Sequence, residues 1–190
     1  MALAEIDEVV PPPAILGRRS RMDDVTEELR RCAYDTRSVA KRFGVHPRLG
    51  VNFWRVLRPD WTPRYEDPVD ALLELFIDGY AVAIDRLRTH FSSSFLDAVI
   101  DMRLVERSGR SLLSRVCLFP CYGKYLVTDR AEKNTAINQV MWLWGESNML
   151  GGIVKRMPRK RAIDLGTGSG VHAILASDRC QEVMAVDING

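Results

Sequence analysis

The sequence predicts a mixed fold, in which a mainly helical α+β N-terminal domain precedes the first βαβ unit of an α/β fold. Two patterns predict it. Apolar residues recur at helical spacing from residue 22 to Gly44 and again from Asp67 to about residue 107, on either side of an irregular stretch, and the period then changes to the alternation of strands. A short apolar run, a glycine turn, a helical run and a second apolar run then follow one another over residues 161–190.

We divide the chain into four parts. Residues 1–20 are expected to be a flexible lead-in, because acidic residues precede the apolar part and three prolines interrupt it. Residues 21–130 form the N-terminal domain, residues 131–160 supply linker helices, and residues 161–190 begin the α/β domain.

Composition excludes several classes of protein. Hydrophobic residues make up 46% of the 190 residues and charged residues 27%, which excludes gross disorder. No apolar run approaches the length of a membrane span, so we expect no membrane partner and a cytoplasmic location. The four cysteines fit no zinc-ligand spacing, so no metal site is predicted and the thiols are expected to be free in a reducing compartment.

The N-terminal domain begins with helical periodicity. Residues 23–44 are expected to form one helix, with Asp23 or Asp24 as the N-cap and Gly44 as the C-cap.

Three further helices and a ribbon are expected in the rest of this domain. An Asp-Pro pair at Asp67 begins one helix, residues 81–91 form a second, and a third spans about Ser92 to Arg107 from a serine cap. Strands around two turns follow between Glu106 and Asp129. Three short helices followed by a two-stranded ribbon give the order of a winged helix, so the domain is predicted to be winged-helix-like.

Charge does not favour nucleic-acid binding by this domain. A winged helix that binds DNA places one basic helix in the major groove. The corresponding segment here carries Asp97, Asp101 and Glu106 against Arg103 and Arg107, and phosphate contacts need a net positive surface. A role in packing or in shaping a substrate site is the favoured interpretation, although the net charge of +2 leaves nucleic acid open.

The C-terminal stretch carries the most specific pattern. Residues 161–165 form an apolar strand, "GTGSG" makes a sharp turn, "VHAILASD" is helical, and "EVMAVDI" is a second strand. Glycines are needed where the backbone turns tightly and a ligand approaches it closely. The helix after the turn presents its amide groups to that ligand.

The spacing of the glycines discriminates between ligands. The dinucleotide pattern G-x-G-x-x-G/A, begun at Gly166, would require glycine or alanine at residue 171, which is Val171. The third glycine instead comes one residue earlier, at Gly170. Asp164 precedes the turn, and Asp187 ends the second strand, where a carboxylate can accept hydrogen bonds from a ribose diol. No lysine followed by serine or threonine is present in the turn, which excludes a P-loop.

"DLGTGSG" followed by "VDIN" resembles the first motif and the following acid of class I methyltransferases that depend on S-adenosyl-L-methionine. The "DLGTGSG" form is similar to that of the release-factor glutamine methyltransferases and of the N6-adenine and rRNA methyltransferases. The resemblance covers residues 161–190 and implies a Rossmann-like fold. More loosely, the order of domains resembles bacterial methyltransferases with a small winged-helix-like N-terminal domain.

The resemblance implies a function and a role for each motif residue. The chain would be an enzyme that transfers a methyl group from S-adenosyl-L-methionine to a protein side chain, a nucleic acid or a small metabolite. Asp164 would order the turn and interact with the ammonium group of the cofactor, Asp187 would bind the ribose, and Ile188 would lie against the adenine. The turn residues that would let the backbone approach the cofactor are Gly166, Thr167, Gly168 and Gly170.

The same resemblance implies that parts of the enzyme lie outside the chain. Such a methyltransferase has a larger sheet, of which this chain supplies two strands, and its strand-four motif is absent here. We therefore expect the chain to be the N-terminal part of a longer enzyme, inactive alone, with catalytic residues beyond Gly190. Its open sheet edges favour self-association. Two alternatives remain: a winged-helix interaction or regulatory module with a vestigial cofactor fold, and a nicotinamide-dependent enzyme, which Val171 disfavours.

Overall fold

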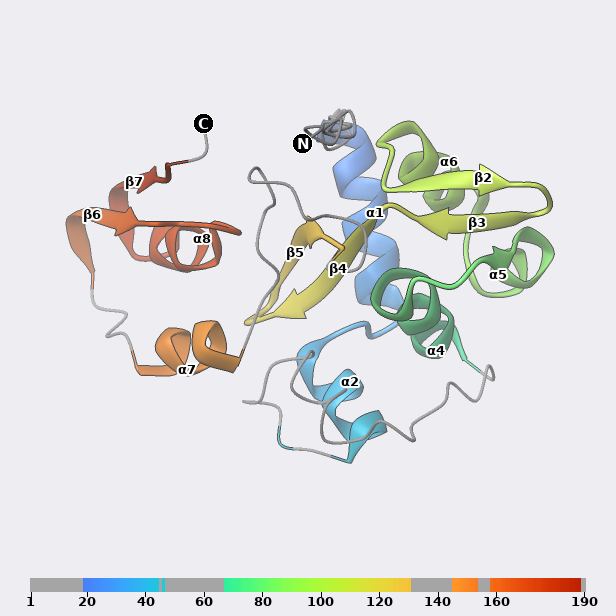
Figure 1. The fold of residues 1–190 in the computed structure, drawn as a ribbon, viewed down its shortest axis with the longest axis horizontal. Helices are drawn as coiled ribbons and strands as arrows, with labels where there is room; N and C mark the ends of the chain where they lie inside the picture. Colours follow the sequence, from blue (N-terminus) through green and yellow to red (C-terminus); the bar gives the residue numbers. More distant parts are fainter. Residues whose placement is uncertain (1–18, 45, 47–66, 131–144, 154–157, 189–190) are drawn as a thin grey trace, which may run out of the picture.

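The computed structural model of this protein describes residues 19–44, 46, 67–130, 145–153 and 158–188. Within these residues the fold is mixed α and β, with seven α-helices, one π-helix and three small sheets (Figure 1). The expected lead-in lies outside the described residues except for its last two, which belong to the first helix. The linker is described from residue 145 to 153 and from residue 158 onward.

The single helix expected over residues 23–44 is two helices, which corrects that prediction. Helix α1 spans Arg19–Arg31 and helix α2 spans Thr36–Phe43. The chain turns at Ala33, whose φ is +53°. The Asp35 side chain accepts a hydrogen bond from the Ser38 amide at 2.7 Å and so begins a new helix.

The expected N-cap of this pair of helices is wrong, and the expected C-cap is confirmed. Asp23 and Asp24 lie inside α1 and do not cap it. Gly44 is confirmed as a C-cap, because it adopts the left-handed conformation at φ +65° and its amide bonds to the last turn of α2.

The helix expected from Asp67 is confirmed, and it changes type along its length. Asp67 accepts a hydrogen bond from the Asp70 amide at 3.0 Å and caps α4 (Pro68–Leu72). The chain then continues as a π-helix, η1 (Leu73–Asp78), which ends at Gly79 in the left-handed conformation. The Arg130 guanidinium lies buried beneath this end and donates to the carbonyl oxygens of Phe76 and Ile77, both at 3.2 Å.

The next elements form a small three-stranded antiparallel sheet with two helices. Strand β1 (Val82–Ala83) leads into α5 (Ile84–His90), and α6 (Ser93–Asp101) follows. Strands β2 (Val105–Ser108) and β3 (Ser111–Ser114) then form a hairpin, and the order across the sheet is β1-β3-β2.

The Ser92 cap of α6 is confirmed, but the expected length of the helix is not. The helix ends at Asp101 and not at Arg107, because Arg103 adopts a left-handed conformation at φ +59° and the chain turns into β2. Residues 105–108 are thereby strand and not helix.

The expected two-stranded ribbon is two separate hairpins. Strand β4 (Val116–Cys121) pairs with β5 (Lys124–Asp129) in a sheet of its own, with no pairing to β2 or β3. Ser114 separates the hairpins, since its hydroxyl bonds to the Val116 carbonyl at 2.7 Å and bends the chain between β3 and β4. Every residue of β4 is buried.

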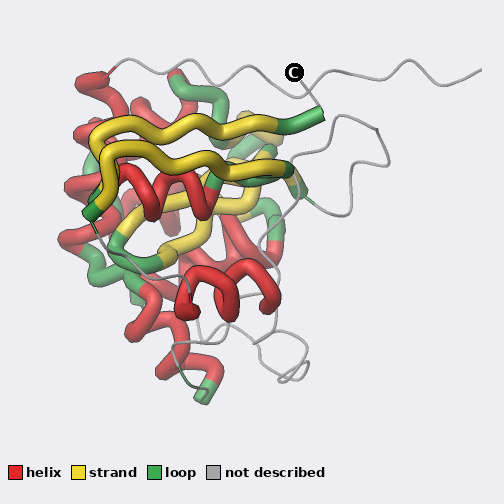
Figure 2. The backbone as a smooth tube through the Cα atoms, turned by 90° about the vertical axis from the view of Figure 1, so that its left-hand side faces the viewer, coloured by secondary structure: helices red, strands yellow, loops and turns green. Residues whose placement is uncertain are grey.

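The last described part confirms the expected strand, turn, helix and strand. After α7 (Gly145–Ile153), strand β6 (Arg159–Leu165) leads through the glycine turn into α8 (Val171–Ser177), and β7 (Cys180–Val186) pairs with β6 in parallel. Figure 2 shows the two strands side by side at the front of the view.

One hydrophobic cluster forms the core of the described part of the chain. It is built mainly from α1, α2, α4, η1, α6 and β4, and it also includes Val171 and Leu175 of α8. In Figure 1 the β4–β5 hairpin lies between α1 and the β6–α8–β7 unit. Within the described residues, no helix has both the length and the apolar character needed to cross a bilayer.

Candidate functional site

The glycine turn links the carboxyl end of β6 to the start of α8. Gly166, Gly168 and Gly170 all have positive φ, at +67°, +51° and +73°. The amides of Gly166 and Thr167 both bond to the carbonyl oxygen of Val186, at 2.8 and 3.0 Å. The turn is therefore fixed to the carboxyl end of the neighbouring strand β7.

The requirement for glycine in this turn comes from backbone conformation and not from crowding. A Cβ atom added at Gly166 or Gly168 would meet no heavy atom within 4 Å, and one added at Gly170 would meet only the Ile174 side chain, at 3.8 Å. Left-handed φ values strain any residue with a Cβ atom. The turn thus presents bare backbone to open space, which is the arrangement that a closely bound ligand requires.

The Asp164 carboxylate holds the glycine turn in place through two hydrogen bonds. Its Oδ2 atom accepts a hydrogen bond from the Thr167 hydroxyl at 2.7 Å and a second from the Ala173 amide at 2.9 Å. The carboxylate therefore joins the middle of the turn to the first turn of α8. The resemblance implies that Asp164 orders the turn, and in the structure its carboxylate bonds to Thr167 within that turn.

Asp187 closes the turn from the side of β7. Its Oδ2 atom accepts a hydrogen bond from the Gly168 amide at 2.8 Å. The acid that follows the second strand and the central glycine of the turn are 19 positions apart in sequence, and the parallel pairing of β6 and β7 brings them together.

The structure brings together all but one of the predicted cofactor residues. Asp164, Asp187 and the turn residues 166–170 form one hydrogen-bonded unit. Ile188 is 97% exposed and packs against no part of that unit.

Two contacts of the site were not anticipated from the sequence. The Ala173 amide completes the bonding of Asp164, and the sequence carries no signal for it beyond the helical spacing from the turn. Lys124 of the β4–β5 hairpin pairs with Asp178, the residue that ends α8, at 2.7 Å. Only the fold reveals that pair, because 54 positions separate the two residues.

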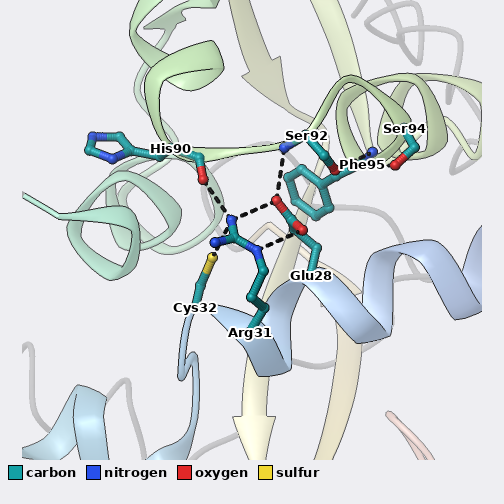
Figure 3. A network of polar contacts seen from close by, with 7 residues as sticks. All are labelled: Glu28, Arg31, Cys32, His90, Ser92, Ser94 and Phe95. Atoms are coloured by element: carbon teal, nitrogen blue, oxygen red, sulfur yellow. Dashed lines mark hydrogen bonds and ion pairs between the residues drawn. The ribbon is translucent and has the colours of Figure 1, made fainter.

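A second polar cluster lies far from the glycine turn in sequence and joins α1 to the α5–α6 connection (Figure 3). The buried Glu28 carboxylate accepts hydrogen bonds from the Arg31 guanidinium at 2.9 and 3.0 Å and from the Ser92 amide at 2.8 Å. Arg31 also donates to the His90 carbonyl oxygen at 2.8 Å. Its contacts tie helices together, which indicates a structural role.

The electrostatics of this cluster follow from its hydrogen bonds. The Arg31 guanidinium, with help from the Ser92 amide, holds the pKa of the Glu28 carboxyl below its ordinary value, against the opposing effect of burial. Burial raises the pKa of the adjacent Cys32 thiol, and the positive charge of Arg31 only partly offsets this effect. Cys32 is thus kept as a thiol, the weakly nucleophilic form.

Comparison with known proteins adds no relative from which a function could be transferred. No protein-family model matches the chain, and no curated protein matches it. The function of the chain is therefore inferred from the glycine turn and the residues that surround it.

Proposed function

We propose that this chain carries the S-adenosyl-L-methionine-binding part of a methyltransferase. The observation that carries the proposal is the hydrogen bond from the Gly168 amide to Asp187. It sets a carboxylate, suited to a ribose diol, beside a turn of bare backbone that faces open space. A dinucleotide-binding turn would need its third glycine one residue later, where Val171 stands.

The arrangement of β6, α8 and β7 supports a Rossmann-like fold for this part. In such folds a ligand binds at the carboxyl ends of parallel strands. Asp164 and the turn lie at that end of β6, and Asp187 lies at that end of β7.

The residues present fit this cofactor. The space beside Gly166 and Gly168 would receive the methionine part, and Asp164, already bonded to Thr167 and Ala173, would hold the turn in place. Asp187 would bind the ribose hydroxyls, and the exposed Ile188 would cover the adenine. When bound, S-adenosyl-L-methionine supplies an electrophilic methyl group. No residue is assigned to the acceptor or to catalysis.

The order of the preceding elements supports a winged-helix-like arrangement, and with it a second candidate function. A helix, a short strand, two helices and a hairpin follow one another from α4 to β3, with the strand order β1-β3-β2. A winged-helix module that binds another protein, with a cofactor fold that no longer binds ligand, would show the same order. Nucleic acid is not favoured, since α6 contains Asp97 and Asp101 but no lysine or arginine and so has no cationic face.

Calorimetric titration with S-adenosyl-L-methionine and with NAD tests the proposal. We expect binding of the first and not of the second. Gly168→Ala should weaken binding at least about tenfold, because its Cβ atom would enter the space beside the turn. Gly109→Ala is the matched control: Gly109 has a similar φ of +60° and equally open surroundings, but it lies in the β2–β3 turn.

Three outcomes are distinguishable. Loss of binding in Gly168→Ala alone supports the proposed site, and equal losses in both variants show a general effect of strain. Binding of neither cofactor by the folded full-length protein refutes the proposal and favours the interaction module.

A further inference from the structure

The tip of the β4–β5 hairpin carries an unusual residue for its conformation. Cys121 pairs with Lys124, so Tyr122 and Gly123 form a two-residue loop. Both have positive φ, +50° and +78°, as a type I′ turn requires. Asparagine followed by glycine is the usual pair in such a turn, and a bulky side chain at positive φ is strained.

The loop of the other hairpin carries no such residue, although Ala33 and Arg103 also have positive φ where the chain turns. The β2–β3 loop consists of Gly109 and Arg110, and only the glycine has positive φ. A residue that keeps a strained conformation does so because its surroundings hold it there. The contacts of the Tyr122 ring therefore indicate which part of the fold holds this residue in its strained conformation.

The Tyr122 ring packs closely against α7 at Gly151. A Cβ atom added at Gly151 would lie 3.1 Å from Cε2 of Tyr122 and 3.3 Å from its hydroxyl oxygen. The same added atom would lie 3.5 Å from the Leu175 side chain of α8. The ring thus sits at the place where α7 and α8 meet.

The hairpin holds α8 at further points. The Lys124 ammonium group pairs with the Asp178 carboxylate at the carboxyl end of α8, at 2.7 Å. On its buried side α8 places Val171 and Leu175 in the same hydrophobic cluster as Leu118 and Phe119 of β4. The hairpin therefore contacts the carboxyl end of α8 through the Lys124–Asp178 pair, and α8 and β4 contribute side chains to the same hydrophobic cluster.

We propose that the tip of the β4–β5 hairpin, residues 122–124, is a latch that fixes α7 and α8 and thereby positions the glycine turn. Gly170 caps α8, and the amides of Ala173 and Ile174 bond back to Asp164 and to the Gly170 carbonyl. A shift of α8 consequently moves the turn. The latch makes the N-terminal domain a support for the candidate ligand site, through Tyr122 and Lys124 as positioning residues.

Hydrogen exchange on the full chain tests the latch without any ligand. Tyr122→Asn removes the ring but places a residue suited to the turn, so the hairpin itself should remain folded. We expect the amides of α7, α8 and the glycine turn to exchange about tenfold faster, while those of β4 and β5 are unchanged. Arg110→Asn, which also places an asparagine in a two-residue hairpin loop but far from α7 and α8, is the control and should leave both helices unaffected.

The ion pair provides a test with a rescue. Lys124→Glu should raise exchange in α8 by a factor of about two to five, as expected for an exposed pair. Adding Asp178→Lys restores opposite charges with their positions reversed and should return exchange toward the wild-type rate. A mere loss of stability from the first substitution would not be rescued by the second.

Titration of the same variants with S-adenosyl-L-methionine is a further test, and it rests on the proposed function. We expect Tyr122→Asn to weaken binding of S-adenosyl-L-methionine by about the same factor as it accelerates amide exchange in the glycine turn. If the full-length protein binds no S-adenosyl-L-methionine but the exchange pattern is as expected, the latch stands and the proposed function fails. If exchange in α7, α8 and the turn is unchanged in both Tyr122→Asn and Lys124→Glu, the latch is refuted.

Discussion

At the scale of single residues, the two acids of the glycine turn already have protein partners. Asp164 accepts from Thr167 and Ala173, and Asp187 accepts from Gly168. Each bond uses a backbone amide or a hydroxyl that the turn would otherwise have to leave to water. The turn is therefore shaped by the fold itself, which lowers the ordering cost that a ligand would have to offset.

Glu28 gives a prediction about pH at this scale. Its folded-state pKa lies below the ordinary value of 4.5, chiefly through Arg31, so its contribution to stability is present above about pH 4.5 and is lost as pH falls through the folded-state pKa. Glu28→Gln should lower the free energy of unfolding by about 1.5 to 3 kcal/mol at neutral pH. The difference from wild type should shrink below pH 4.5.

Urea denaturation at a series of pH values measures this difference. Glu106→Gln is the control, because Glu106 forms a more exposed pair with Arg115, and such a pair contributes little. A difference between Glu28→Gln and wild type that stays constant down to pH 3 would contradict the role assigned to the carboxylate.

At the scale of elements, residues close together in sequence predicted many of the helix ends and the order of the last strands and helix. Contacts between distant residues determined the other features. The caps at Gly44, Asp67 and Ser92 were readable because each acts within four residues. The order strand, turn, helix and strand could also be predicted, because each of its signals lies within a few residues. The break at Ala33 was missed because apolar spacing continues across it, although Asp35 followed by Ser38 in fact starts a second helix.

The candidate site divides in the same way between local and distant contacts. Asp164 and the three glycines were predicted because their roles depend on a turn of a few residues. The latch residues Tyr122 and Lys124 were not predicted, because neither the strain of Tyr122 nor the distant partners of the two residues leave a pattern in the neighbouring sequence. The place of Asp187 beside Gly168 required only the assumption that the two strands are parallel.

The end of the π-helix gives a prediction at the scale of elements. A Cβ atom on Gly79 would lie 2.1 Å from Nη2 of Arg130, whose guanidinium is buried and bonded to backbone carbonyls of η1. Gly79→Ala should therefore combine the strain of a φ of +74° with displacement of that guanidinium. We expect a loss of about 3 kcal/mol in the free energy of unfolding, measured with urea.

Gly109→Ala separates these two effects, since Gly109 has positive φ without neighbours and should lose only about 1 kcal/mol. In a double-mutant cycle, Arg130→Ala should make Gly79→Ala less costly. Equal losses at Gly79 and Gly109 would show that the guanidinium moves aside freely.

At the scale of the whole molecule, the described part of the chain covers β6 and β7 on one face only. Side chains alternate along a strand, and Asp164 points to α8, where it bonds to the Ala173 amide. On the other face, Ile163 lies opposite Met184 and Leu165 lies opposite Val186. All four are exposed, Leu165 to 77%. Parallel sheets in stable proteins are covered on both faces.

This uncovered face predicts that the chain self-associates, beyond the association expected from its open sheet edges. Its four apolar side chains form a contiguous patch of the kind that binds other surfaces. The molar mass from light scattering should rise with concentration, and a hydrophobic dye should bind. Leu165→Lys combined with Met184→Lys should lower both signals, because a charged side chain opposes burial of the face.

Met22→Lys, at an exposed apolar residue of α1, is the control and should change neither signal. A wild-type chain that stays monomeric and binds no dye at any concentration would contradict this prediction.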